Sequence, residues 1–159
     1  MPTISLRVNG KSVSAEVEAR TLLVELLRER LGLTGTHVGC DTTYCGACTV
    51  LVDNKPVRSC VYPVRNANGR EVRTIEGLSK NGELHPLQKA FVEHDALQCG
   101  FCTPGMILTA YSLLRENPQP TREEIIQGMD DNFCRCGGYH RIIQAIEAAA
   151  QTMRKGGRR

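Results

Sequence analysis

The chain has 159 residues, a net charge of +3, 41% hydrophobic residues and only 4% aromatic residues. This length allows one domain or two small domains, and a small core alone would be only marginally stable. A modest charge without a basic helix argues against nucleic-acid binding, and no apolar run is long enough to span a membrane.

The start of the chain predicts a β-hairpin followed by a helix. Residues 4–8 and 12–17 alternate apolar and polar side chains on either side of Asn9-Gly10, a strong two-residue turn. Thr21 is a suitable N-cap for the next helix, because leucines follow it at helical spacing as far as a glycine. We expect this leucine stripe to pack against the sheet.

Further strand signals complete the first half. An irregular, cysteine-rich stretch over residues 35–48 precedes a second predicted hairpin, with strands at 49–52 and 57–62. A last short strand is predicted at 72–75. The first half is therefore expected to be mostly β-structure with one helix.

The second half has helical periodicity instead. Pro104 suits the first turn of a helix with Thr103 as its N-cap, and Thr121 opens a capping box with Glu124. Four helices are expected, over residues 84–97, 103–117, 121–129 and 139–153. Consecutive helices joined by short loops predict a bundle.

These patterns predict an α+β fold with two domains. Residues 1–77 form the first, β-rich domain, and residues 83–153 form the helical domain. The segment between them has the composition of a linker. The end of the chain, residues 154–159, is expected to be a flexible basic tail.

The eight cysteines fall into two groups of four. The chain begins without a signal-peptide pattern, so a cytoplasmic location is expected. Disulfides are disfavoured in that compartment, and the cysteines therefore predict metal coordination. The first group is Cys40, Cys45, Cys48 and Cys60, and the second group is Cys99, Cys102, Cys134 and Cys136.

The first group has the spacing of an iron–sulfur site. A C-x4-C-x2-C run with a fourth cysteine further on matches the plant-type fingerprint for a [2Fe–2S] cluster, whereas zinc sites usually pair two CxxC units. Gly39 and Gly46 flank ligands where a Cβ would hinder close approach, and they leave N–H groups free to point at sulfur. Such donors raise the reduction potential of a cluster.

The second group combines a CxxC with a CxC, each at a junction that precedes a predicted helix. A CxC pair does not easily chelate one zinc ion, although two irons can share it. Spacing alone does not distinguish a zinc site from an iron–sulfur cluster at this group. Helix N-termini directed at the site would stabilise a negatively charged cluster.

Three motifs resemble those of a known family. Residues 39–50, 98–106 and 132–139 are similar to signatures of the xanthine oxidase (molybdenum hydroxylase) family, and the resemblance extends over nearly the whole chain. It matches the form in which the iron–sulfur part is a separate small subunit, as in carbon monoxide dehydrogenase, aldehyde dehydrogenase and bacterial xanthine dehydrogenase.

The resemblance implies a plant-type ferredoxin-like β-grasp domain followed by a four-helix bundle. It places the helical-domain cluster next to molybdopterin and the other cluster towards flavin. By the same match, Gln98 and the ligand Cys136 would hydrogen-bond the pterin. Two alternatives are that Gln98 caps a helix end and that Cys136 has no second role.

The chain departs from the family pattern at two positions. Many relatives have threonine where this chain has Gly137, and lysine where it has His37. We expect Gly137 to loosen the following helix cap and His37 to alter the field near the first cluster. The histidines otherwise have the pattern of surface or packing residues, and none is expected to be a ligand.

The resemblance implies an electron-transfer subunit of an oxidoreductase, without a substrate-converting site of its own. A large molybdopterin subunit would hydroxylate the substrate, and a medium subunit would hold FAD, in a heterotrimer doubled about a two-fold axis. Electrons would pass from molybdopterin through the two clusters to FAD or to an external acceptor. Two alternatives remain. A free-standing two-cluster ferredoxin-type carrier would purify alone, and a zinc-stabilised scaffold would be colourless.

Overall fold

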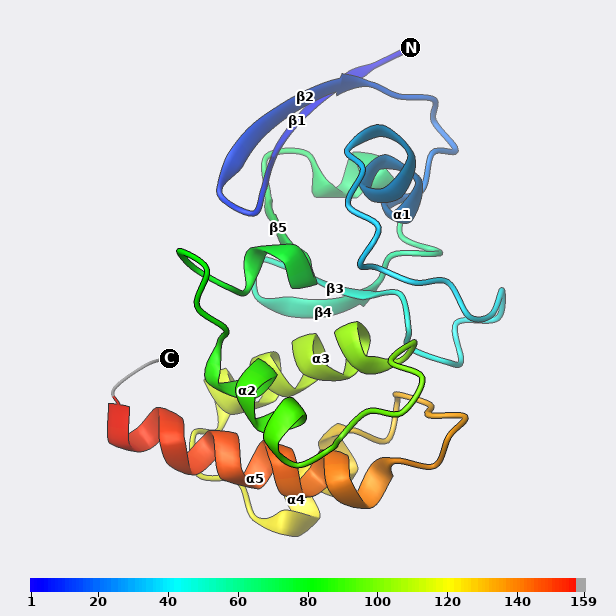
Figure 1. Ribbon diagram of the computed structural model, residues 1–159. Coiled ribbons are helices and arrows are strands. Elements are labelled where there is room, and N and C mark those ends of the chain that lie inside the picture. Colours follow the sequence, from blue (N-terminus) through cyan, green and yellow to red (C-terminus); the bar gives the residue numbers. More distant parts are fainter. Residues whose placement is uncertain (157–159) are drawn as a thin grey trace.

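The computed structural model describes residues 1–156, and a five-stranded sheet forms the first half of the molecule (Figure 1). The strand order is β2-β1-β5-β3-β4. The β1–β5 pair is parallel, and the other neighbouring strands are antiparallel. The strands are β1 (Thr3–Val8), β2 (Lys11–Glu16), β3 (Thr49–Val52), β4 (Lys55–Arg58) and β5 (Glu71–Arg73).

Both predicted hairpins are present. Asn9 and Gly10 have φ values of 51° and 80°, and Asp53 and Asn54 have values of 50° and 64°, which suit tight two-residue turns. The last strand of the second hairpin begins earlier than predicted, because β4 pairs with β3 directly after the turn. It also ends earlier, at Arg58.

The leucine stripe forms a short helix that continues as a π-helical turn. The helix is α1 (Leu23–Glu25), and the π-helical turn spans Leu26–Arg30. Its leucines are buried against the sheet, as expected. Thr21 is not the N-cap, because the helix starts after Leu22, whose N–H donates to the Glu25 carboxylate at 2.6 Å.

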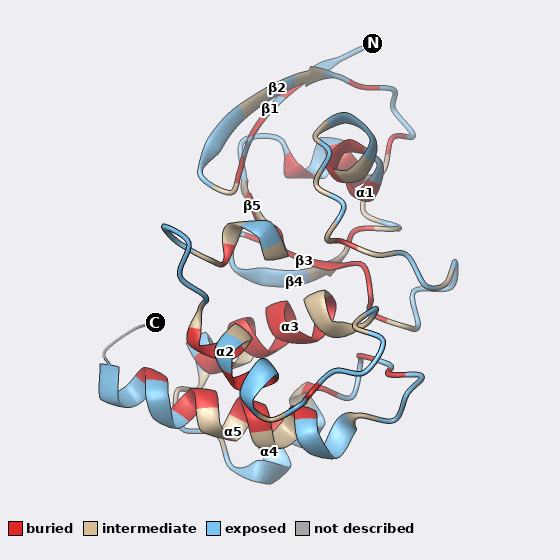
Figure 2. Ribbon diagram, in the orientation of Figure 1, coloured by how far each residue is buried: buried red, intermediate tan, exposed pale blue. Residues whose placement is uncertain are grey.

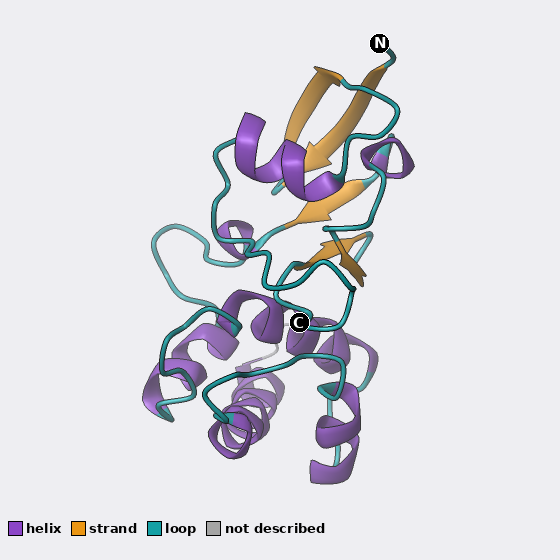
Figure 3. Ribbon diagram, turned by 90° about the vertical axis from the view of Figure 1, so that its right-hand side faces the viewer, coloured by secondary structure: helices purple, strands orange, loops and turns teal. Residues whose placement is uncertain are grey.

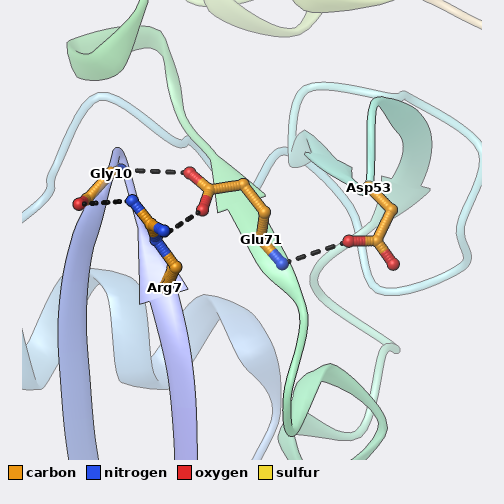
Figure 4. Close-up of polar contacts among 4 residues, drawn as sticks. All are labelled: Arg7, Gly10, Asp53 and Glu71. Atoms are coloured by element: carbon orange, nitrogen blue, oxygen red, sulfur yellow. Dashed lines mark hydrogen bonds and ion pairs between the residues drawn. The ribbon is translucent and has the colours of Figure 1, made fainter.

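Glu71 on β5 ties the two hairpins together (Figure 4). Its carboxylate accepts from the Gly10 N–H at 3.0 Å and pairs with Arg7 at 3.2 Å. Its own N–H donates to the Asp53 carboxylate at 3.1 Å. The single strand β5 thus holds both hairpin turns in register.

Four helices form the second half, as predicted. The Thr121 capping box is confirmed, with Thr121 Oγ1 accepting from the Glu124 N–H at 3.2 Å. Thr103 is not an N-cap, because Cys102 occupies that position. The helices are α2 (Pro86–Glu93), α3 (Thr103–Glu116), α4 (Arg122–Gly128) and α5 (Tyr139–Gly156).

Two of these helices differ clearly in length from the prediction, whereas α3 and α4 differ only by a terminal residue at one or both ends. The first, α2, is shorter because Pro86 occupies its first position and the chain leaves the helical conformation at His94. The last, α5, continues past Met153, so residues 154–156 of the predicted tail are helical. Residues 157–159 lie outside the described part of the chain. Among residues 1–156, no helix combines the length and apolar character needed to cross a membrane.

The two halves are packed against each other through α3. In Figure 3 the helices of the second half, α2 to α5, lie below the sheet, and Figure 2 shows α3 as the most continuously buried helix. Leu51 of β3 belongs to the helical core rather than to the sheet core. Near the start of α3, a Cβ on Gly105 would overlap the Gly46 carbonyl oxygen. The backbones of the two halves therefore approach as closely as glycine allows.

Candidate metal centres

The first cysteine group converges at the edge of the sheet. Cys40, Cys45 and Cys48 lie in the loop before β3, and Cys60 lies two residues after the end of β4. The prediction that Cys60 is on a strand is therefore wrong. Cys48 is buried, and the other three are partly exposed.

Within this group the thiols form two pairs. The Cys45 thiol is hydrogen-bonded to Cys40, and the Cys60 thiol to Cys48. Burial raises the pKa of Cys60 to about 12, and the charges of Cys48, Cys40 and Cys45 add to this increase. All four sulfurs are thus close enough to influence one another.

Backbone amides of the loop point at Cys40 and Cys45, the outer pair of this group, whereas Cys48 and Cys60 are its inner pair. The Cys45 N–H lies 3.4 Å from Cys40 Sγ, and the Ala47 N–H lies 3.4 Å from Cys45 Sγ. Hydrogen bonds from the backbone N–H groups of Cys45 and Thr42 lower the pKa of Cys40 to about 6. The loop is therefore arranged to stabilise negative charge on sulfur.

The two glycines predicted to allow close approach do so for different reasons. A Cβ on Gly39 would lie 3.3 Å from Cys45 Sγ, as the sequence suggested. Gly46 has a φ of +73°, and its Cβ would lie 2.7 Å from the Asp131 carbonyl oxygen. The constraint on Gly46 therefore comes from the helical half.

The second group is assembled from two helix starts. Cys102 is the N-cap of α3, Cys99 lies in the loop before it, and Cys134 and Cys136 lie in the loop before α5. The Cys102 thiol is hydrogen-bonded to Cys134, and the Cys136 thiol to Cys99. Cys134 is buried and Cys102 partly buried, whereas Cys99 and Cys136 are exposed.

The electrostatics of this group repeat those of the first. Burial raises the pKa of Cys102 to about 12, and the hydrogen bond with the Cys134 thiol adds to this increase. A hydrogen bond from the Phe101 N–H lowers the pKa of Cys99, and the hydrogen bond with the Cys136 thiol lowers it further. The Gly138 N–H lies 3.4 Å from Cys134 Sγ, so the start of α5 supplies a donor as predicted.

The pairing in both groups fits a [2Fe–2S] cluster. Each iron of such a cluster takes two thiolates, so four cysteines arranged two and two match its ligand demand. Within residues 1–156, no group of three or more His, Cys, Asp or Glu side chains has the arrangement needed to hold a single metal ion. A rhombic cluster does not require such an arrangement, because its four thiolates are divided between two irons.

Gln98 and Cys136 lie together on an exposed face. Gln98 Nε2 donates to the Cys136 carbonyl oxygen at 3.4 Å. Since α2 ends at Glu93, this hydrogen bond places Gln98 beside the second group rather than at a helix end. Gly137 between the CxC pair and α5 has a φ of +74°, a backbone conformation in which threonine would be strained.

A short segment before Cys134 joins the two groups. The Phe133 N–H donates to the Cys45 carbonyl oxygen at 2.8 Å, and Asn132 Nδ2 donates to the Gly46 carbonyl at 3.3 Å. Arg58 donates to the Asp131 carbonyl at 2.7 Å. Asn132 and Phe133 belong to the motif over residues 132–139, but the sequence did not indicate that these residues, Asp131 and Arg58 join the two groups.

The chain matches two family models and several known proteins. The models are the 2Fe-2S iron-sulfur cluster binding domain over residues 6–74 and the [2Fe-2S] binding domain over residues 74–147. The nicotine 6-hydroxylase small subunit of Paenarthrobacter nicotinovorans is 46% identical over 155 residues, which cover 97% of this chain and 93% of that subunit.

Two solved structures also match this chain over almost its whole length. A chain of quinoline 2-oxidoreductase from Pseudomonas putida 86 matches with a TM-score of 0.92 and 48% identity, covering 98% of this chain and 97% of that chain. The aldehyde oxidoreductase from Desulfovibrio gigas matches with a TM-score of 0.93 and 43% identity, but only 18% of that longer chain is covered. The predicted ferredoxin-like domain followed by a helical domain is thereby confirmed.

Proposed function

The chain belongs to the small iron–sulfur subunits of the molybdenum hydroxylase family, and we propose that electrons enter it at the helical-domain centre and leave from the ferredoxin-like centre. Its role in the oxidoreductase is electron transfer with two [2Fe–2S] clusters. Molybdopterin and FAD belong to other subunits of such enzymes. The resemblance stated from the sequence is confirmed.

The proposed ligands are the eight cysteines. Cys40, Cys45, Cys48 and Cys60 would hold one cluster, and Cys99, Cys102, Cys134 and Cys136 the other. Each cluster, when bound, accepts and releases one electron. The chain's own part is to hold the thiolates in pairs and to direct amide N–H groups at their sulfurs, which stabilises the added charge.

The observation that best supports the proposed direction is the unequal exposure of the two groups. Cys99 and Cys136 form the only thiol pair among residues 1–156 in which both members are exposed. We propose that this face, with Gln98, meets the pterin of the large subunit. From there, the hydrogen bond between Phe133 and the Cys45 carbonyl links the loops of the two centres.

The partners follow from the relatives. Nicotine 6-hydroxylase has a small subunit of this type, so this chain is also part of a multi-subunit complex. We propose a large molybdopterin subunit, a medium FAD subunit and a heterotrimer doubled about a two-fold axis. We also propose the cytoplasm as its location, since eight cysteines that bind metal clusters instead of forming disulfides suit a reducing compartment.

The substrate class is proposed from the same comparisons. Nicotine and quinoline, in the names of two relatives, are both N-heteroaromatic compounds. We propose that the large partner subunit hydroxylates a ring of this class. We also retain the proposed division of the chain into residues 1–77 and 83–153, which is supported by the change from strands to helices between β5 and α2.

Affinity purification of the tagged chain from its own host tests the function. We expect it to elute with a larger molybdenum-containing subunit and to carry about four irons with matching labile sulfide, two per cluster. A red-brown chain that elutes alone would indicate a free-standing carrier. A colourless chain with stoichiometric zinc would indicate a scaffold.

A further inference from the structure

His37, three residues before Cys40, contacts Phe101 in the loop of the second cysteine group. Its ring stacks on the Phe101 ring, with centroids 4.6 Å apart and an interplanar angle of 22°. Its Nδ1 atom lies 2.8 Å from the Phe101 carbonyl oxygen. Because a carbonyl oxygen only accepts, Nδ1 carries the hydrogen in this contact. This contact reaches the second centre, in addition to the expected effect of His37 on the first.

The segment that carries His37 is held in place by the first half. Arg28 Nη1 donates to the Thr34 carbonyl at 2.8 Å and to the Thr36 carbonyl at 2.6 Å. The Gly35 N–H donates to the Glu76 carboxylate at 3.0 Å. Thr36 itself is buried. The imidazole is thus presented from a fixed backbone and not from a free loop.

Phe101 occupies a sensitive place in the second centre. It lies between Cys99 and Cys102, and its N–H is directed at the Cys99 sulfur. A Cβ on Gly39 would lie 3.2 Å from the Phe101 ring, so the first loop also limits where that ring can move. The Phe101 carbonyl and N–H belong to adjacent peptide units, so a change in the backbone angles of Phe101 would redirect the N–H relative to Cys99 when the carbonyl is held.

We propose that His37 is a positioning residue for the helical-domain centre, acting through its hydrogen bond to the Phe101 carbonyl. By holding this carbonyl, it keeps the 99–102 loop in the conformation that directs the Phe101 N–H at Cys99. Amide donors to a ligand sulfur stabilise the reduced, more negative state, so His37 raises the reduction potential of this centre. The inference rests on the proposed ligand set.

Two substitutions separate the hydrogen bond from the ring contact. His37→Asn retains an amide donor close to the position of Nδ1 but removes the ring. His37→Phe retains a ring that can stack on Phe101 but removes the donor. Both variants are uncharged at this position, so a difference between them does not come from the charge of the imidazole.

The experiment is a redox titration of the purified complex, followed by the EPR signals of the two clusters. Cys48→Ser identifies the ferredoxin-like signal by altering it. We expect His37→Phe to lower the potential of the helical-domain centre by about 59 mV, a tenfold change for a one-electron couple. The other centre should keep its potential, and His37→Asn should leave both close to the wild-type values.

Three outcomes would overturn the inference. They are unchanged potentials in His37→Phe, equal shifts of both centres in that variant, and a shift in His37→Asn as large as that in His37→Phe. If the proposed function were wrong instead, the wild-type complex itself would not show the EPR signals of two [2Fe–2S] clusters.

Discussion

The two centres differ in how the chain builds them and agree in how their charges are arranged. The first takes three cysteines from one loop, whereas the second joins two loops at the starts of α3 and α5. Yet each has an inner pair in which burial raises the pKa of one thiol, Cys60 or Cys102, to about 12. Each also has an outer thiol, Cys40 or Cys99, whose pKa backbone donors lower.

The difference lies in the outer pairs. Cys40 and Cys45 are only partly exposed, and Cys45 is connected to the helical half through Phe133. Cys99 and Cys136 are exposed. The outer pair is therefore more exposed at the second centre than at the first, which suits a relay that receives electrons at the second centre and passes them on to the first.

Replacing one cysteine ligand, at either centre in turn, should have the largest effect on electron transfer and should separate the roles of the two centres. We expect Cys102→Ser in the assembled complex to abolish turnover, because electrons could not leave the molybdenum subunit. Cys48→Ser should slow turnover but leave substrate reduction of molybdenum intact in a single turnover. Stopped-flow spectroscopy of both variants measures this. Loss of molybdenum reduction in a correctly assembled Cys48→Ser complex would reverse the proposed order.

The charge arrangement predicts unequal thiol reactivity in the cluster-free chain. Near pH 7, Cys40 should be largely thiolate and alkylated first, while Cys60 and Cys102 should remain protonated and slow, since the thiolate is the nucleophile. Mass spectrometry after timed iodoacetamide treatment measures the order. Equal rates at all three positions would contradict the inner and outer assignment.

The lowered pKa of Cys40 also affects the stability of the cluster-free fold. The pKa of Cys40 is lower in the folded chain than the ordinary thiol value. Its thiolate therefore stabilises the cluster-free fold above the pKa of the unfolded chain, and this contribution is lost as the pH falls through about 6. Urea unfolding of Cys40→Ser and wild type at several pH values should show the difference shrinking towards acid.

Gly105→Ala probes the contact that places the centres side by side. Its Cβ would overlap the Gly46 carbonyl oxygen, so we expect a loss of about 1–3 kcal/mol from forced backbone shifts. Thermal unfolding of the complex measures it. Gly156→Ala is the matched control, because its Cβ would meet nothing within 4 Å. Equal melting temperatures for the two variants would show that the halves adjust freely.

Asn132→Ala should have the smallest effect. It removes the donor to the Gly46 carbonyl from a side chain that is only 3% exposed, and one such hydrogen bond contributes about 1 kcal/mol. A melting temperature only slightly below wild type is expected. We also expect slower reduction of the ferredoxin-like centre, measured by freeze-quench EPR, because this residue helps to dock the Phe133 segment. A wild-type rate would exclude that role.

What the sequence could predict was local. Asn9-Gly10 and the Thr121 capping box are determined by residues a few positions apart, and both were confirmed. The α+β fold followed from the change between strand and helix periodicity, and the family followed from the resemblance of three motifs around the cysteines.

One miss was local, and the others depended on partners far away in the sequence. Cys60 left its predicted strand because β4 pairs with β3 immediately after the turn. The contact of Gly46 with Asp131, and the stacking of His37 on Phe101, join residues more than sixty positions apart in the sequence. No local pattern indicates such contacts.

The docking of residues 131–133 onto the first cysteine loop also constrains how the protein matures. Once the Phe133 N–H is bonded to Cys45 and Asn132 to Gly46, the helical half covers one side of the first loop, and Cys48 is already buried. The second centre cannot close until the chain has been synthesised as far as Cys136. We therefore expect cluster insertion to be ordered during biogenesis, with the first cluster delivered before the helical half docks over its loop.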